Sequence, residues 1–214
     1  MKKLAELTTA EFVDLLASDA PAPGGGSAAA LEGALGCRPV RHGLRSDHRG
    51  QEQGEVRRLS GVRHREPEEA DRAEGRFRGR DGSGHRGFQC RQRRLWHAKA
   101  TDEEKAARSA AIQEGLKGCT KTPMEMMELI DETLTLAQSL LGRFNDTSAS
   151  DLGVAFLSLK AGIQGAWLNV LINVGSLKDQ EFAAEYRAKG EALLAHALPL
   201  ADECYAEIVK LIEG

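Results

Sequence analysis

The residues of this chain best suited to binding chemistry lie in the stretch PAPGGGS, residues 21–27, which precedes an alanine-rich run. Its prolines fix φ and oppose a helix before them, whereas its glycines let the backbone adopt either sign of φ. We expect Ser27 to cap the helix that follows. The N–H groups at such a helix start are uncovered, so an anion or a flat polar ligand could lie against the backbone. The candidate ligand contacts are Gly24, Gly25, Gly26 and Ser27, and the alternative is a plain loop that leads into a helix.

A second group of candidate polar residues lies directly before, within and after the apolar stretch 152–174. Asp151 could face a substrate, or it could only interact with the dipole at the start of a helix. Asn169 and Asn173 are four residues apart, so both fall on one face of a buried helix and need hydrogen-bond partners. A ligand edge or the neighbouring backbone would serve equally well. The last candidate, His196, has apolar neighbours, and we expect it to be a packed structural histidine.

Helices must position these candidates, because apolar residues recur at helical spacing outside residues 37–98. The stretch 151–174 is apolar nearly all round and rich in glycine and alanine, which predicts a central helix with others packed closely on it. We expect Pro199 to kink the last helix. The pattern predicts one all-α helical bundle over residues 1–214, with helices at 9–18, 27–35 or beyond, 101–117, 122–141, 151–174 and 179–212. The predicted helix starts are Thr8 with Glu11, Thr101 with Glu104, Thr122, and Ser148 or Ser150. We expect Gly142 to be a C-cap.

The composition is typical of a soluble helical protein in a reducing compartment. Aromatic residues make up 5% of the 214 residues, so Leu, Ala, Val and Ile must build the core. The four cysteines show no C-x-x-C spacing, which favours free thiols. No continuous apolar segment opens the chain, and polar residues interrupt the stretch 152–174. We therefore expect a cytoplasmic protein in which this stretch is a buried helix rather than a membrane span.

Residues 37–98 differ from the rest of the chain in a way that points to the gene. They contain no Lys, Ile, Met, Thr or Asn, although these types supply 31 of the other 152 residues. Every codon for these five amino acids begins with adenine, so a GC-rich message read in a shifted frame would exclude all of them together. We interpret this window as a frameshift product inside a single domain.

Three alternatives remain for the window. It holds 16 Arg against 9 Asp and Glu, so it could be an arginine-rich segment that binds nucleic acid. It could be a disordered basic insert. Cys37, His42, His48 and Cys90 could ligate a metal, although no pair of them has zinc-site spacing.

The stretch PAPGGGSAAALEGALG and the segment from Asn145 to Val174 carry a family resemblance. Over residues 4–36 and 99–212 the chain resembles the cyclodeaminase/cyclohydrolase family, which comprises the C-terminal domain of formiminotransferase-cyclodeaminase and the stand-alone methenyltetrahydrofolate cyclohydrolases. The resemblance implies a homodimeric helical bundle that binds a reduced folate, for which the glycine turn, Asp151, Asn169 and Asn173 are the candidate contacts. It implies hydrolysis of methenyltetrahydrofolate or loss of ammonia from formiminotetrahydrofolate, with no metal or redox cofactor.

The resemblance also implies a catalytic carboxylate in a D-x-D-x-x-A-F motif, which this chain lacks as written. Read one nucleotide later with suitable codons, the end of the window gives DQDTEAF, whose second Asp straddles the codons of Gly84 and His85. The catalytic residue of the chain is therefore unknown, with Asp151 as the remaining candidate, and its activity as written is in question. The alternative from another class is a non-catalytic helical scaffold whose 37–98 segment binds nucleic acid.

Overall fold

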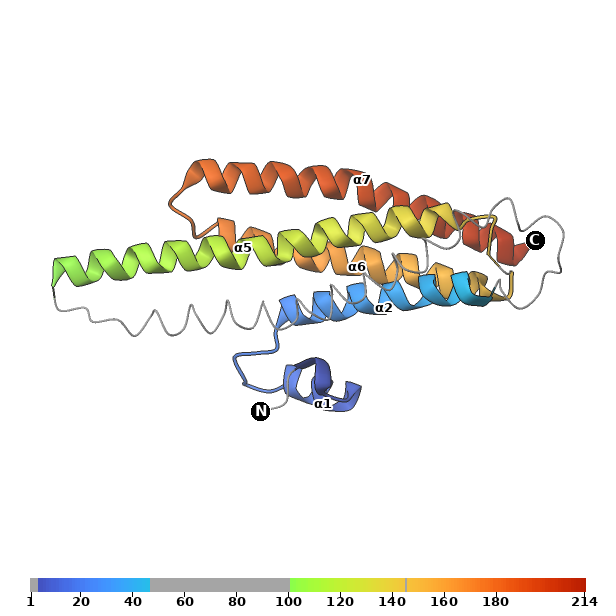
Figure 1. The fold of residues 1–214 in the computed structure, drawn as a ribbon, viewed down its shortest axis with the longest axis horizontal. Helices are drawn as coiled ribbons and strands as arrows, with labels where there is room; N and C mark the ends of the chain where they lie inside the picture. Colours follow the sequence, from blue (N-terminus) through green and yellow to red (C-terminus); the bar gives the residue numbers. More distant parts are fainter. Residues whose placement is uncertain (1–3, 47–100, 145) are drawn as a thin grey trace.

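The computed structural model describes residues 4–46, 101–144 and 146–214. This part of the chain is helical and contains no strand, so the predicted all-α class is confirmed. Figure 1 shows the long helices side by side, with a short helix apart from them. The elements are the 3-10 helix η1 Leu4–Glu6, α1 Thr9–Leu16, α2 Gly25–Ser46, α5 Asp102–Ser139, the 3-10 helix η3 Asp146–Ser148, α6 Ala149–Val174 and α7 Gln180–Glu213.

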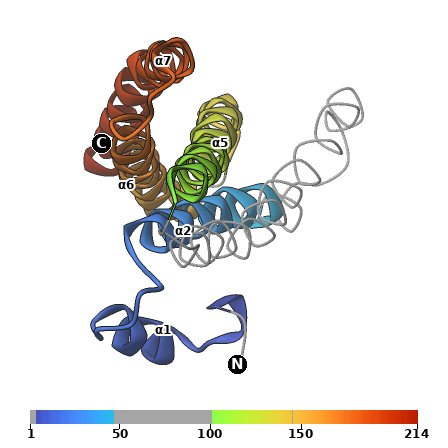
Figure 2. The ribbon, with the colours of Figure 1, turned by 90° about the vertical axis from the view of Figure 1, so that its left-hand side faces the viewer.

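Helix α6 is the central helix and packs against α2, α5 and α7 (Figures 1 and 2). It runs antiparallel to α2, because Gly162 of α6 lies against Gly33 whereas Leu159 lies against Gly36. Helix α1 lies beyond α2, away from the other three long helices, in both views. The central position predicted for residues 151–174 is therefore confirmed.

The core explains why α6 takes this position. Its buried side chains are apolar, and glycines and alanines among them let neighbouring backbones approach closely. Of the described helices, α6 is the one long and apolar enough to cross a membrane by length and composition alone. Buried core helices of soluble proteins pass the same test. The residues of α6 that are buried are Ala149, Leu152, Gly153, Ala155, Phe156, Leu159, Gly162, Ile163, Ala166, Val170 and Val174.

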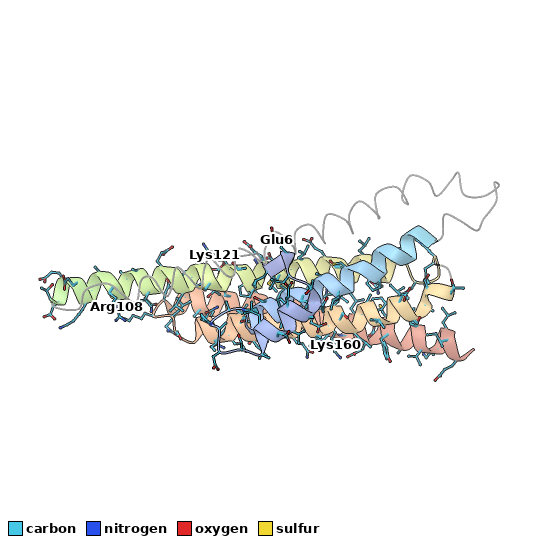
Figure 3. The ribbon with its side chains drawn as sticks, turned by 90° about the horizontal axis from the view of Figure 1, so that it is seen from below. Glu6, Arg108, Lys121 and Lys160 are labelled. Carbon is cyan, nitrogen blue, oxygen red and sulfur yellow. The ribbon has the colours of Figure 1, made fainter. Side chains whose placement is uncertain are left out.

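Polar pairs join α7 to the helices beside it. Lys117 Nζ lies 2.5 Å from Asp179 Oδ2 and His196 Nδ1 lies 2.6 Å from Asp131 Oδ1, so α5 and α7 run in the same direction. Lys160 of α6, labelled in Figure 3, forms an ion pair with Asp202 of α7, and Lys189 forms one with Glu128 of α5. These pairs are partly exposed, so each contributes little to the free energy of unfolding.

Helix α5 is continuous where the sequence predicted two helices, at 101–117 and 122–141. Pro123 was expected at the start of the second helix, but it lies buried in the middle of one. A proline in a helix interior leaves the carbonyl four residues earlier without its usual N–H donor. That carbonyl belongs to Cys119, and Nδ2 of Asn173 in α6 donates a hydrogen bond to it at 3.0 Å. A neighbouring helix thus replaces the bond that Pro123 removes.

Several predicted helix ends are confirmed. Both capping boxes form, at Thr8 and at Thr101, with the side chain of each accepting from the N3 backbone N–H. Asp179 caps α7 through a 3.0 Å hydrogen bond from the N–H of Phe182. The C-cap predicted at Gly142 is wrong by two residues, because Leu140 takes that position; Gly142 follows it with a φ of 71°, a conformation that favours glycine. Ser148 takes the N-cap position of α6, but its side chain makes no capping hydrogen bond.

The start of α2 differs from the prediction that Ser27 caps it. The helix begins at Gly25, and the Gly24 carbonyl accepts hydrogen bonds from the N–H groups of Ser27 and Ala28. Glycine lacks a Cβ, so the helical turn extends back through these residues as far as Pro23 permits. The uncovered helix start is present, two residues earlier than expected.

The first part of the anomalous window continues α2. A frameshift product is expected to pack irregularly over residues 37–98, and this expectation is wrong for 37–46, which are helical. Cys37 is 1% exposed and Val40 is 0% exposed, and both belong to the hydrophobic core. The rest of the window, with Cys90 and the region of the DQDTEAF frame, lies outside the described residues.

Candidate functional site

The N-terminus of α2 presents bare backbone. Gly24 and Gly25 are exposed, and a Cβ added at Gly24 would meet no atom within 4 Å. The first N–H groups of an α-helix have no partner within the helix, and the dipole makes this end positive. The glycines keep side chains away from these donors, so a flat ligand or an anionic edge could reach them directly.

Asn169 of α6 lies beside this helix start. A Cβ added at Gly26 would lie 3.3 Å from Oδ1 of Asn169, so a larger residue there would push the amide group aside by a few tenths of an ångström. The Nδ2 group of Asn169 donates a 2.8 Å hydrogen bond to the carbonyl of Gly165, which orients the side chain. Its Oδ1 acceptor therefore lies next to the N–H donors of α2. The two form a mixed donor and acceptor edge.

Asn173 has a structural role one turn further along α6. Its Nδ2 group donates to the carbonyls of Asn169, at 2.8 Å, and Cys119, at 3.0 Å. Of the alternatives left open by the sequence, the structure shows the backbone one. Contact of Asn173 with a ligand stays a prediction.

A seam of small residues sets the distance between α2 and α6. A Cβ added at Gly165 would lie 3.0 Å from the Cβ of Ala29. A Cβ added at Gly162 would lie 3.0 Å from the backbone nitrogen of Gly33. At Gly36 an added Cβ would lie 2.5 Å from a side-chain carbon of Leu159. The close approach of backbones along this seam places the start of α2 against Asn169.

Asp151 does not join these residues within one chain. It lies in the first turn of α6, where a carboxylate interacts favourably with the helix dipole. Asn169 follows 18 residues later, which is about 27 Å along a helix with a rise of 1.5 Å per residue. The predicted site residues therefore fall into two groups, with Asp151 in one and Gly24 to Ser27, Asn169 and Asn173 in the other.

His196 is exposed rather than packed, so that expectation is wrong. Its side chain is 57% exposed, and its Nδ1 lies 2.6 Å from Oδ1 of Asp131. The buried row of α7 includes Ala197 and Leu200, which turns His196 toward the edge of α5. No local sequence pattern predicts this pairing, because Asp131 lies 65 residues away.

No metal centre is evident among residues 4–46, 101–144 and 146–214, where no group of three His, Cys, Asp or Glu side chains could hold an ion. Cys37, Cys119 and Cys204 form no disulfide with one another in the described part of the chain. Burial raises the pKa of the Cys204 thiol to about 11. Arg108, near the start of α5 (Figure 3), has a buried Nε without a hydrogen-bond partner in the described part of the chain.

These features define an all-α protein with a candidate ligand site where a glycine-lined helix start meets an asparagine of the central helix. The model of the formiminotransferase-cyclodeaminase family matches residues 8–45 and 89–192. The chain belongs to this family.

Known relatives agree with this assignment. The chain is 37% identical over 205 residues to a methenyltetrahydrofolate cyclohydrolase of Methylorubrum extorquens, covering 94% of this chain and 95% of that protein. It is 35% identical over 112 residues to the formimidoyltransferase-cyclodeaminase of Sus scrofa, which is 52% of this chain and 21% of that protein. The crystal structure of formiminotetrahydrofolate cyclodeaminase from Thermotoga maritima shares the fold, with a TM-score of 0.80, 22% identity and coverage of 98% and 97% of the two chains.

The comparisons match different parts of residues 37–98. The family model leaves residues 46–88 unmatched, which lie inside the window of 37–98. The match to the Methylorubrum protein covers 94% of the chain and so continues through the window. The unmatched segment is therefore narrower than the window defined by amino-acid composition.

Proposed function

We propose that this chain is a folate-dependent one-carbon enzyme of the methenyltetrahydrofolate cyclohydrolase or formiminotetrahydrofolate cyclodeaminase type. Family membership and the near full-length similarity to a cyclohydrolase support the proposal. The structural observation that carries it is the edge formed by the Gly24 to Ser27 helix start and Oδ1 of Asn169. A pterin ring is flat and carries both donors and acceptors at its edge, which this arrangement complements.

Both reactions require the protein to position the substrate, to stabilise a positive charge and to transfer a proton. In cyclohydrolysis, water adds to the cationic carbon between two ring nitrogens, one C–N bond breaks, and a proton moves to the released nitrogen. In cyclodeamination, a ring nitrogen attacks the formimino carbon and ammonia leaves. Both reactions need a carboxylate near the cation and a group that transfers a proton. Neither reaction changes an oxidation state, and these two groups are sufficient for both, so our proposal includes no metal or redox cofactor.

We propose further that residues within 37–98 derive from a shifted reading frame. The absence of five amino-acid types and the gap at 46–88 in the family match support this. The burial of Cys37 and Val40 in α2 counts against a frame change as early as Gly36. The nucleotide sequence tests the proposal, since the alternative frame must encode DQDTEAF without a stop codon. Peptide mass spectrometry of the native protein shows which frame is translated.

A homodimer is part of the proposal. Helix α6 carries a row of exposed apolar side chains, including Leu168 at 65% and Ile172 at 73% exposure. Rows of this kind on a soluble protein mark interaction surfaces. Localisation in the cytoplasm, without membrane insertion of α6, belongs to the same proposal.

The decisive experiment compares the chain as written with a frame-corrected version. We expect both to bind methenyltetrahydrofolate, and only the corrected chain to hydrolyse it at an enzymatic rate, because general acid and base catalysis contributes about 10² to 10⁴ in rate. Loss of methenyltetrahydrofolate absorbance and release of ammonia from formiminotetrahydrofolate separate the two reactions. A corrected chain without affinity for any reduced folate rejects the proposal.

The arginine excess of residues 37–98 supports one other function, a helical scaffold that binds nucleic acid. Binding of that kind weakens steeply with salt, because each neutralised phosphate releases a counterion. Tight RNA binding that falls about 10³-fold between 50 and 200 mM salt, together with no folate binding, would establish the scaffold instead.

A further inference from the structure

The side-chain oxygen of Asn169 is an acceptor whose direction is fixed. The Nδ2 group of Asn169 donates a 2.8 Å hydrogen bond to the carbonyl of Gly165. A carbonyl oxygen only accepts, so this contact assigns Nδ2 to the side of Gly165 and Oδ1 to the opposite side of the amide. Oδ1 lies beside Gly26, 3.3 Å from the place of an added Cβ. Asn169 therefore offers an acceptor, and no donor, to a ligand at the start of α2.

Two backbone donors lie next to this acceptor. The Gly24 carbonyl accepts hydrogen bonds from the N–H groups of Ser27 and Ala28. The N–H groups of Gly25 and Gly26, the first two of α2, donate to no residue in the described part of the chain. A backbone nitrogen lies about 2.5 Å from the Cβ position of its own residue, so the Gly26 nitrogen is within about 6 Å of Oδ1 of Asn169. One edge of a small ring can reach both groups.

Hydrogen bonds from the neighbouring residues hold this acceptor in place. The Nδ2 group of Asn173 donates to the backbone carbonyl of Asn169, at 2.8 Å, and to that of Cys119 in α5, at 3.0 Å. The backbone of Asn169 is thus joined to α5, and rotation of its side-chain amide would break the bond to Gly165. A preorganised group loses little conformational freedom on binding. It also does not adapt to a ligand of the wrong pattern.

We infer that Asn169 is a specificity-determining residue which, with the N–H groups of Gly25 and Gly26, selects a ligand edge that carries an oxygen acceptor beside an N–H donor. A 4-oxopteridine has this edge, because its O4 oxygen is followed by N3–H. A 2,4-diaminopteridine has the opposite pattern, since an amino group replaces O4 and N3 carries no hydrogen. The site therefore binds 4-oxopteridines and rejects their 2,4-diamino counterparts.

This assignment rests on the proposed folate function and adds which edge of the ring the protein recognises. With a 2,4-diaminopteridine, an amino N–H faces the backbone N–H groups, and the N3 lone pair faces Oδ1 of Asn169. Each of these groups then loses its contact with water and gains no partner. An unpaired polar group weakens binding about tenfold or more, so two mismatches should weaken it about 100-fold.

A matched pair of ligands tests the inference. Tetrahydrofolate and its 2,4-diamino counterpart, tetrahydroaminopterin, differ only in the group at position 4 and the hydrogen at N3. Isothermal titration of the chain as written should give a Kd about 100-fold higher for the diamino compound. Similar affinities for both would overturn the inference and leave the proposed function in place. No binding of tetrahydrofolate would reject both.

Substitution of Asn169 separates specificity from stability. Asn169→Leu keeps a similar volume and removes the acceptor, so the ratio of the two affinities should fall from about 100 to about 10. Gln113→Leu is the matched control, because both polar atoms of this amide are bonded within the chain, to the carbonyl of Ser176 and the N–H of Lys178. Its ratio should stay at the wild-type value. A purely structural role of Asn169 would weaken both ligands equally, and an unchanged ratio in Asn169→Leu would overturn the inference.

A third measurement needs no substitution in the site. An amide proton that donates to a ligand oxygen moves downfield in the NMR spectrum. In nitrogen-labelled protein saturated with tetrahydrofolate, the signal of Gly25 or Gly26 should move in this way, whereas that of Gly118, on the outer face of α5, should not. If neither Gly25 nor Gly26 responds, the oxygen of the ligand is not at the start of α2 and the inference is overturned.

Discussion

Asn173 donates a hydrogen bond to the carbonyl of Cys119, the group that Pro123 leaves without its helical donor. The two residues lie on different helices, 54 positions apart. Their 3.0 Å hydrogen bond replaces the backbone hydrogen bond that α5 lacks at Pro123. This contact keeps α5 continuous along the central helix. It also fixes α6 against α5 one turn from Asn169.

A double-mutant cycle tests the repair. Asn173→Ala should lower the free energy of unfolding by about 1–3 kcal/mol, because a part-buried carbonyl loses its donor. In a Pro123→Ala background the residue at 123 supplies an N–H of its own, so the same change should cost much less. Urea unfolding of the four proteins gives the coupling energy. Equal costs in both backgrounds would show that Asn173 does not compensate for the proline.

Gly26→Ala tests the ligand edge. The new Cβ would lie 3.3 Å from Oδ1 of Asn169, so it covers the helix start and displaces the acceptor. We expect reduced folate to bind about tenfold more weakly, with stability unchanged or raised because alanine favours a helix. Gly118→Ala is the control, since a Cβ there would meet nothing within 4 Å. Isothermal titration with a reduced folate distinguishes the two variants.

Gly162→Ala tests the seam between α2 and α6. Its Cβ would lie 3.0 Å from the backbone nitrogen of Gly33 and 3.4 Å from the carbonyl oxygen of Ala29, and backbone atoms cannot move aside. We expect a loss of about 1–3 kcal/mol in the free energy of unfolding from overpacking. Chemical denaturation measures it, with Gly118→Ala again as reference. A neutral result would mean that α2 is free to shift along the seam.

Acid should weaken the contact between α5 and the start of α7. The hydrogen bond from Lys117 holds the pKa of Asp179 below its ordinary value. A carboxyl with a lowered folded pKa stabilises the fold above its unfolded pKa, and this contribution is lost as pH falls through the folded value. Stability should therefore drop below about pH 4. Asp179→Asn keeps a capping side chain but lacks the charge, so thermal unfolding should show a shallower acid limb for it than for the wild type.

The decline of stability at high pH should depend on Cys204. Burial raises the pKa of its thiol from 9.0 to about 11, so the folded state holds a proton that the unfolded chain releases. Stability is then complete below pH 9 and declines as pH rises toward 11. The pKa values of Lys117 and Lys189 are also raised, by Asp179 and Glu128, and their contributions decline in the same direction. In a Cys204→Ala variant, stability should fall less steeply as pH rises, because the thiol is absent. If the variant and the wild type show the same dependence of stability on pH, the thiol is not the source of the decline.

Local sequence patterns were sufficient for much of the fold. Capping boxes at Thr8 and Thr101 start helices through contacts within four residues, so they are legible without tertiary information. The apolar residues all round 151–174 predicted the central helix, because a helix without a polar face must be covered on several sides. The uncovered start of α2 followed from its run of glycines, apart from the exact cap.

Only the tertiary structure decided which distant residues meet. Proline propensity alone predicts a helix start at Thr122, and the continuous α5 depends on a donor from α6 that no local pattern contains. His196 has apolar neighbours in sequence, yet its direction is set by which face of α7 is buried. Asn169 joins the glycine turn because a seam of small residues lets two backbones approach.

The sequence by itself determined the helices, the bare helix start and the identity of the polar groups that could serve a site. Their distances were decided by packing, which placed Asn169 beside Gly26 and left Asp151 about five turns away on the same side of α6. The physical reason is that hydrogen bonds within a helix connect neighbours along the chain. The contacts between helices depend on the shapes of surfaces far apart in sequence.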